Sequence, residues 1–330
     1  HGAAPDALRR ELRAALGTAA RAQRSRAAFR RALELQALGT RPASVRLDLL
    51  RALGAEAAGL PEAAAAFAQL CAEDRSFRAR YLLQAPAAEL ARGGDAGARG
   101  FLRESLARDP SPHVRAQAAR ASAGLAALLP ELGAALGDAE PRVREAALEA
   151  LATATGAAAP AATETAVVRL LHTDPWTFVR AAAAGALARR RVSAETDRAL
   201  GEALADPAPA VRRATLRAIA RRRSPATAEP VRRLADQPQE TLDVREAAID
   251  ALGALCDAES VGLLTKLVQR TAASVLPYDR PLGLAALGAL GRIHPPDLDA
   301  RLAPLVDRRV EPAIRALARA TLRAPGSCGR

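Results

Sequence analysis

Apolar residues recur along this chain with the spacing of helices rather than strands. They stand three, six and seven positions after a series of arginines, and Leu132 and Leu136 lie about one helical turn apart. This spacing places apolar side chains on one face of a helix, whereas a half-buried strand would alternate at every second residue. Many of these residues are alanine and aromatics make up only 2% of the chain, so thin layers of closely packed helices are expected. The pattern predicts an all-α fold.

One frame repeats along the sequence. An aspartate, usually with a proline close behind it, is followed six residues later by an arginine that stands after a valine. The clearest copies pair Asp109 with Arg115, Asp138 with Arg144, Asp174 with Arg180, and Asp206 with Arg212. Weaker copies lie at Arg46, Arg78, Arg245, Arg280 and Arg315, and successive frame arginines are 29 to 37 residues apart. That length suits one helical hairpin, so each repeat is expected to be a helix, a tight turn and a second helix.

This frame resembles the HEAT-repeat family across roughly residues 41–323, most strongly from Asp109 to Leu252. The resemblance implies an α-α superhelix, a right-handed solenoid of about nine repeats. In that family the turn aspartate and the second-helix arginine form a ladder of hydrogen bonds between adjacent repeats, and this role is carried over to the four pairs named above. Residues 1–40 are expected to be an N-terminal helical cap and residues 324–330 a C-terminal tail.

The frame also departs from the family pattern. No aspartate stands six residues before Arg78, Arg245, Arg280 or Arg315, so the ladder is left open there. Pro86 is expected to bend or shorten the helix after Arg78. The glycines of RGGDAGARG, Arg92–Gly100, imitate a phosphate-binding motif, but neither a strand before them nor a Gly-Lys pair after them supports it, and an ordinary loop is expected.

Positive charge is concentrated in one part of the chain. The net charge is +12, and residues 180–233 hold 13 arginines against 5 acids. The runs Arg189–Arg191 and Arg221–Arg223 follow their frame arginines at equal distances, so in a stacked array they should be neighbours. With Arg213 and Arg217 they predict a basic ridge, and a localised positive field favours an anionic partner.

The sequence leaves three alternatives for this ridge. It binds an acidic protein or other polyanion, it binds a nucleic acid, or it is only a solvated edge. Aromatic side chains for base stacking are not interleaved with the arginines, since Trp176 and Tyr278 stand apart at turns. Trp176 either covers the seam between repeats or is an anchor for a partner. Lys266 is the only lysine, and the excess of alanine and arginine is typical of a high-GC bacterial sequence.

Candidate chemistry is sparse. Cys71, Cys256 and Cys328 are isolated and have no histidine at ligand spacing, so no metal site is expected. Spacing leaves open whether Cys256 and Cys328 pair. His113 and His172 each lack a second ligand nearby. The sequence contains no recognised catalytic or cofactor-binding motif and no stretch apolar enough to span a membrane, and we expect neither catalysis nor a cofactor.

The leading functional hypothesis is a non-enzymatic scaffold that binds a protein on its surface. The alternatives are a nucleic-acid or polyanion binder that uses the ridge, and a C-terminal accessory module of a larger exported enzyme. The sequence contains no methionine and begins His1-Gly2. This start slightly favours an exported bacterial protein, with a cytoplasmic one as the alternative, and the oligomeric state stays open.

Overall fold

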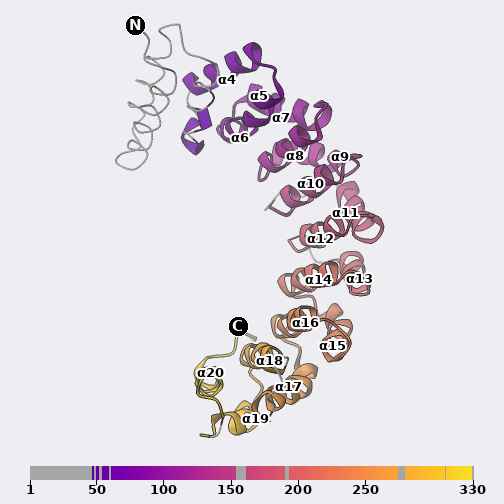
Figure 1. Cartoon of the computed structure of the whole chain (residues 1–330), viewed down its shortest axis with the longest axis vertical. Helices are drawn as coiled ribbons and strands as arrows, with labels where there is room; N and C mark the ends of the chain where they lie inside the picture. Colours follow the sequence, from indigo (N-terminus) through magenta and orange to yellow (C-terminus); the bar gives the residue numbers. More distant parts are fainter. Residues whose placement is uncertain are drawn as a thin grey trace, which may run out of the picture. The chain divides into compact units, whose positions relative to one another are not determined.

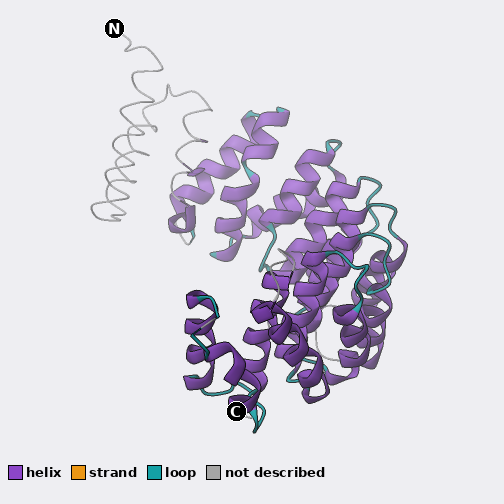
Figure 2. Ribbon diagram, turned by 60° about the horizontal axis from the view of Figure 1, so that its bottom comes forward, coloured by secondary structure: helices purple, strands orange, loops and turns teal. Residues whose placement is uncertain are grey.

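The structure is a computed structural model that describes residues 47, 50–51, 54–58, 61–153, 161–189, 193–273, 279–308 and 310–328. The cap predicted over residues 1–40 lies outside this range. The described residues form helices and contain no strand, which confirms the all-α fold class (Figure 2). The chain divides into two compact units, residues 1–158 and residues 159–330.

Unit 1 is a stack of helical hairpins (Figure 1). The helices α8 and α10 lie side by side, α6 packs against α8, and α7 and α9 pack against each other in a second layer. Its elements are η1 (Gly54–Ala57), α4 (Pro61–Glu73), α5 (Phe77–Leu82), α6 (Gln84–Arg92), α7 (Ala96–Arg108), α8 (Pro112–Ala121), η2 (Ala126–Leu128), α9 (Leu129–Ala135) and α10 (Pro141–Thr153).

Unit 2 repeats this arrangement. The helices α12, α14, α16 and α18 pack side by side, and each also packs against the helix that precedes it in the chain. Its elements are α11 (Ala161–Thr173), α12 (Thr177–Leu187), α13 (Ala194–Ala203), α14 (Pro209–Arg222), η3 (Pro225–Thr227), α15 (Ala228–Asp236), α16 (Leu242–Leu255), η4 (Ala258–Ser260), α17 (Val261–Ala273), α18 (Asp279–Ile293), α19 (Leu298–Leu302), η5 (Ala303–Val306) and α20 (Pro312–Arg323).

The apolar positions of the frame form the core. After Arg180, the residues three, six and seven positions on are Ala183, Ala186 and Leu187, and all three are buried. The equivalent positions after Arg212 and Arg245 are buried as well. Small side chains let the second helices approach closely: a Cβ on Gly253 of α16 would lie 2.8 Å from the Cα of Ala289 in α18.

The second helices begin two residues before the Val-Arg pair. Pro112, Pro141 and Pro209 are the first residues of α8, α10 and α14. Proline is favourable there because the first N–H groups of a helix have no partner within the helix and the fixed φ suits the helix start.

Two departures in unit 1 have clear local causes. The helix after the first described turn is broken at Leu83, between α5 and α6, and Pro86 lies in the first turn of α6, as its missing N–H requires. The loop expected over Arg92–Gly100 is wrong, because α7 begins at Ala96. Asp95 is its N-cap and accepts a 2.7 Å hydrogen bond from the backbone N–H of Ala98.

Candidate partner-binding surface

In unit 1, arginines on second helices connect adjacent repeats. Arg115 on α8 donates from Nε and Nη2 to the carboxylate of Asp138, at 2.8 and 2.9 Å. Its Nη1 donates to the carbonyl of Asp109, in its own turn, at 2.9 Å. Arg80 on α5 reaches the carboxylate of Asp109 in the same way, at 2.7 Å. Each of these arginines therefore ties its own repeat to the next turn.

Unit 2 repeats these contacts. Arg180 on α12 donates to the Asp206 carboxylate at 2.7 Å, and Arg212 on α14 donates to Glu240 at 2.6 and 2.7 Å. Each arginine also binds the carbonyl six residues earlier, of Asp174 and Asp206 respectively. Arg144 of unit 1 binds the carbonyl of its own turn residue Asp138 at 2.8 Å.

The frame assignments at the weaker repeats need correction. Arg78 is exposed and is not the ladder residue. That position belongs to Arg80, which stands six residues after Asp74, and Asp74 accepts the N–H of Ser76 as the other turn aspartates accept theirs. Before Arg245 the acid is Glu240, only five residues earlier.

Two further frame arginines, where the sequence left the ladder open, make different contacts. Arg280 on α18 pairs with Glu311 at 2.7 Å, and Arg315 on α20 binds the carbonyl of Arg308.

Three of the ladder carboxylates, those of Asp138, Asp206 and Glu240, have a pKa below the ordinary value. Burial alone would raise the pKa of Asp206, but hydrogen bonds from Arg180 and from the backbone of Ala208, with the charges of Arg180 and Arg212, lower it below its ordinary value. Asp138 and Glu240 have lowered pKa values for the same reasons, with Arg115 and Arg212 as their respective partners. The ladder is an internal support for the helices and leaves their outer surface to other side chains.

The C-terminal half of α14 presents arginines to solvent. Arg217, Arg221 and Arg223 are exposed, and none of them pairs with an acid in the described part of the chain. Arg213, earlier on the same helix, forms an ion pair with Asp243 at 2.8 Å. These three exposed side chains are what the structure retains of the predicted ridge around α14, and we call them the α14 arginines.

The prediction that Arg222 belongs to the basic ridge is wrong, because its side chain is only 1% exposed. It donates to Asp197 at 3.1 Å and to the carbonyl of Leu187 at 2.9 Å, and Ser224 donates to the same aspartate. This arginine therefore joins α13, α14 and the end of α12 inside unit 2. From the neighbouring run, Arg189 is exposed, while Arg190 and Arg191 lie outside the described residues.

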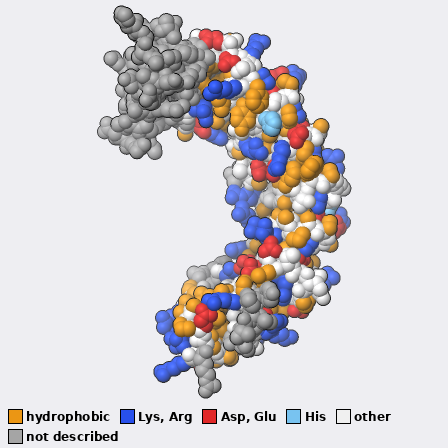
Figure 3. Space-filling view, viewed as in Figure 1, with side chains coloured by type: hydrophobic (Ala, Val, Ile, Leu, Met, Phe, Trp, Pro, Cys, Tyr) orange, Lys and Arg blue, Asp and Glu red, His pale blue; other side chains and the backbone are white. Residues whose placement is uncertain are grey.

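An acidic row lies on the next second helix. Asp243, Glu246 and Asp250 occupy one face of α16, and the pKa of Glu246 is raised by its burial and by the charges of Asp250 and Asp243. The basic and acidic side chains of unit 2 therefore stand on adjacent helices. On the face seen in Figure 3 they form small neighbouring patches rather than an unbroken basic band.

Comparison with known proteins agrees with this architecture. The family model for HEAT repeats matches residues 100–188 and 197–277. The chain belongs to the HEAT-repeat family. No curated protein matches the sequence.

Several solved structures are similar to this HEAT-repeat protein. The X-ray structure of Escherichia coli YibA is 16% identical, with a TM-score of 0.54 over 88% of this chain and 97% of that one. An engineered protein is 18% identical, with a TM-score of 0.48 over 97% of this chain and 95% of that one. The complex of CpcE and CpcF of phycocyanin lyase from Nostoc sp. is 18% identical, with a TM-score of 0.41 over 77% and 92%. At this identity the likeness to YibA concerns the fold alone.

Trp176 stands at the turn of the HEAT repeat formed by α11 and α12. Its side chain is 51% exposed, and its ring centre lies 5.6 Å from that of Phe178. Its backbone N–H donates to Asp174 at 2.9 Å, so the turn aspartate fixes the position of this residue. The structure thus leaves half of a large aromatic side chain available to solvent.

The described residues offer no group of three or more metal ligands, and none of their helices is long and apolar enough to cross a membrane. His172 lies 3.7 Å from Glu202, and His113 is exposed on the first turn of α8. Burial raises the pKa of the Cys71 thiol to about 11, so the thiol is protonated and unreactive near neutral pH.

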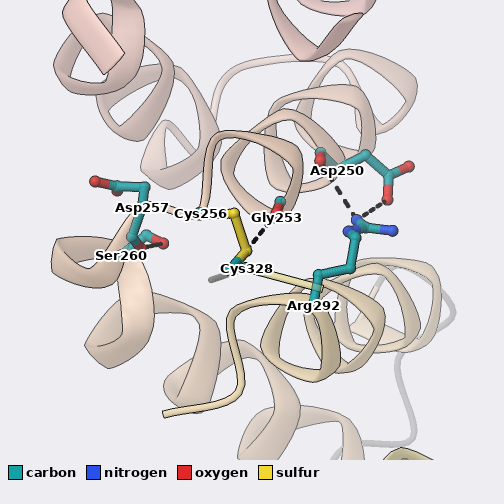
Figure 4. The surroundings of a disulfide bond; sticks show 7 residues. All are labelled: Asp250, Gly253, Cys256, Asp257, Ser260, Arg292 and Cys328. Carbon is teal, nitrogen blue, oxygen red and sulfur yellow. Dashed lines mark hydrogen bonds and ion pairs between the residues drawn. A yellow bond between two sulfur atoms is a disulfide. The ribbon is translucent and has the colours of Figure 1, made fainter. Parts of the chain in front are cut away.

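The remaining two cysteines form a disulfide bond. Cys256, at the end of α16, bonds to Cys328 in the tail, with 5.6 Å between their Cα atoms (Figure 4). The backbone N–H groups of Ser327 and Cys328 both donate to the carbonyl of Arg292, at the end of α18. Sequence reasoning left this pair open and did not single out Arg292, which contacts Asp250 on α16.

Proposed function

We propose that this HEAT-repeat protein is a non-enzymatic scaffold that binds an acidic protein partner through the second-helix surface of unit 2. The α14 arginines carry this proposal. Many arginines of the described residues, including those of the ladder, have an acidic partner, whereas three exposed ones on and just after α14 have none. Unpaired guanidinium groups on a rigid helix are ready to form charge-assisted hydrogen bonds with carboxylates.

The neighbouring acidic row supports a protein rather than a nucleic acid as the partner. A nucleic acid presents a continuous line of phosphates, and a strand that crossed from α14 to α16 would meet Asp243, Glu246 and Asp250. A protein surface with both signs of charge can complement both helices. The half-exposed Trp176, the N-cap residue of α12, supports the same conclusion, since large aromatic side chains are frequent anchors in protein interfaces.

A charge-matched pair of variants tests the proposal. The test variant carries Arg217→Glu and Arg221→Glu on α14. The control carries Arg198→Glu and Arg233→Glu, which change the net charge equally on α13 and α15, at side chains 76% and 73% exposed. Each chain is used for affinity capture from a native lysate, with and without nuclease, and the retained protein is then titrated in purified form.

The expected result is one discrete protein that the parent and the control retain after nuclease treatment and that the α14 variant loses. If nuclease removes everything that the parent retains, the nucleic-acid alternative replaces the proposal. If both variants retain the same protein equally, the α14 arginines are not the binding surface.

A further inference from the structure

A pocket in unit 2 lies beside the disulfide bond at the C-terminal ends of the second helices. Its volume is about 270 Å³, and the residues used below line it: Arg223, Asp250, Gly253, Cys256, Arg292 and Ser327. They come from the end of α14, from α16, from α18 and from the tail, which the disulfide fixes in place. Figure 4 shows Arg292 lying across from Asp250 and Gly253, next to the disulfide.

The guanidinium group of Arg292 is held in place on one side only. Its Nη2 donates to the carboxylate of Asp250 at 2.9 Å and to the carbonyl of the same residue at 3.3 Å. Its Nε is buried and has no hydrogen-bond partner in the described structure. A Cβ on Gly253 would lie 2.7 Å from this Nε, so only glycine admits the guanidinium group here. One N–H of this guanidinium group is therefore left without a partner beside the pocket, while the side chain as a whole is 38% exposed.

The backbone around the pocket is also unusual. Arg223, Cys256 and His294 follow the ends of three successive second helices, and each has a positive φ, of 55°, 58° and 53°. Residues other than glycine rarely adopt this left-handed conformation, which here ends α14 and α16 as their C-caps. Two of the three line the pocket, and the conformation of Arg223 places a guanidinium group without an acidic partner at its rim.

The charges that line the pocket define the ligand. Two guanidinium groups and one carboxylate give the lining a net charge of +1, and the hydroxyl of Ser327 adds a neutral donor. A single carboxylate balances this charge, whereas a phosphate dianion does not. We propose that the pocket binds one carboxylate of the protein partner, either from an acidic side chain or from the partner's carboxyl terminus. This inference rests on the proposed function and names the group that the scaffold recognises.

Three small probes separate these possibilities on the whole 330-residue chain with its disulfide intact. N-acetyl-glutamate α-amide presents a carboxylate on its side chain, N-acetyl-glutamine presents a terminal carboxylate, and N-acetyl-glutamine α-amide is neutral. Binding is followed by NMR through the arginine Nε–H signals and the backbone amide of Ser327. Saturable shifts of the Arg223, Arg292 and Ser327 signals are expected with at least one of the two carboxylate probes and not with the neutral one.

A matched pair of substitutions tests the assignment to this pocket. Arg223→Gln should weaken carboxylate binding about tenfold, because a charge-assisted hydrogen bond is lost at the rim. Arg233→Gln, on α15 outside both the pocket and the α14 arginines, should leave binding unchanged.

The proposal is overturned if the neutral probe causes the same shifts, or if Arg223→Gln binds as tightly as the parent. It is also overturned if inorganic phosphate binds more tightly than either carboxylate probe. If no probe binds but the α14 variant still loses the captured protein, the proposal that the pocket binds a carboxylate is rejected and the proposed function is retained.

Discussion

At the scale of single residues, Arg222 differs from both of its neighbours. It lies three residues after Ile219 and seven after Thr215, on the buried face of α14, while Arg221 and Arg223 face solvent. Its partner Asp197 is 7% exposed at the side chain. We expect Arg222→Ala to lower the free energy of unfolding by about 3–5 kcal/mol, because Asp197 would remain as a buried charge without its cationic partner. Urea unfolding followed by circular dichroism measures this loss.

The neighbouring residue supplies the control. Arg221 is exposed, and we expect Arg221→Ala to change the free energy of unfolding by less than about 0.5 kcal/mol. Equal urea midpoints for the two variants would contradict the internal role of Arg222.

The burial of Arg222 follows from helical periodicity, which the sequence contains. The run of three arginines was interpreted as one charged edge, although the spacing from Thr215 and Ile219 already placed its middle member inward. The identity of its partner was beyond the sequence. Asp197 lies 25 residues earlier on another helix, and only the packing of α13 against α14 brings the two together.

At the scale of helices and turns, the ladder makes the contact between repeats depend on pH. The pKa of Asp206 is lower in the folded protein than in an unfolded one, because Arg180 and the backbone of Ala208 donate to the carboxylate and outweigh the effect of its burial. The folded state therefore binds fewer protons. The stabilisation is fully present above about pH 4, the ordinary pKa of aspartate, and is lost as the pH falls through the folded pKa.

We therefore expect Asp206→Asn to reduce stability at pH 7, with a difference from the parent that shrinks as the pH falls below about 4. Urea midpoints across this pH range test the expectation. Glu229→Gln is a suitable control, since Glu229 is 60% exposed and its ion pair is with the exposed Arg233 on its own helix. A destabilisation by Asp206→Asn that stays constant from pH 7 to pH 3 would show that charge is not its source.

The sequence predicted this level of organisation well where the frame was complete. At Asp109, Asp138, Asp174 and Asp206 the six-residue spacing to an arginine marks the turn, and the structure places a turn there each time. The frame residue Arg78 was misassigned because the valine before the arginine is absent in that repeat, although the spacing from Asp74 to Arg80 obeys the same rule. Sequence reasoning missed Glu240 because it stands five residues before Arg245, where the frame has an aspartate at six. Its longer side chain nevertheless accepts the hydrogen bond from Arg212.

At the scale of the whole molecule, contacts in a repeat array are local, and the disulfide is an exception to this rule. Cys256 and Cys328 are 72 residues apart and enclose α17, α18, α19 and α20. The sequence could not settle this pairing, because it depends on where the tail returns after α20, and spacing along the sequence does not determine that path. The tail returns to Arg292, whose carbonyl accepts two of its N–H groups.

Loss of the disulfide should consequently weaken one unit and spare the other. We expect Cys328→Ser to lower the free energy of unfolding of unit 2 by about 2–4 kcal/mol, because closing a long loop restricts the unfolded state. Hydrogen exchange measured by mass spectrometry should show faster exchange in α17 to α20 and unchanged exchange in α6 to α8 of unit 1. Treatment of the parent with a reductant should reproduce this pattern, and Cys71→Ser, which leaves the disulfide intact, should not. Faster exchange spread evenly over both units would mean that the bond stabilises the array as a whole. Unchanged exchange in α17 to α20 would mean that the hydrogen bonds to the carbonyl of Arg292 suffice to hold the tail.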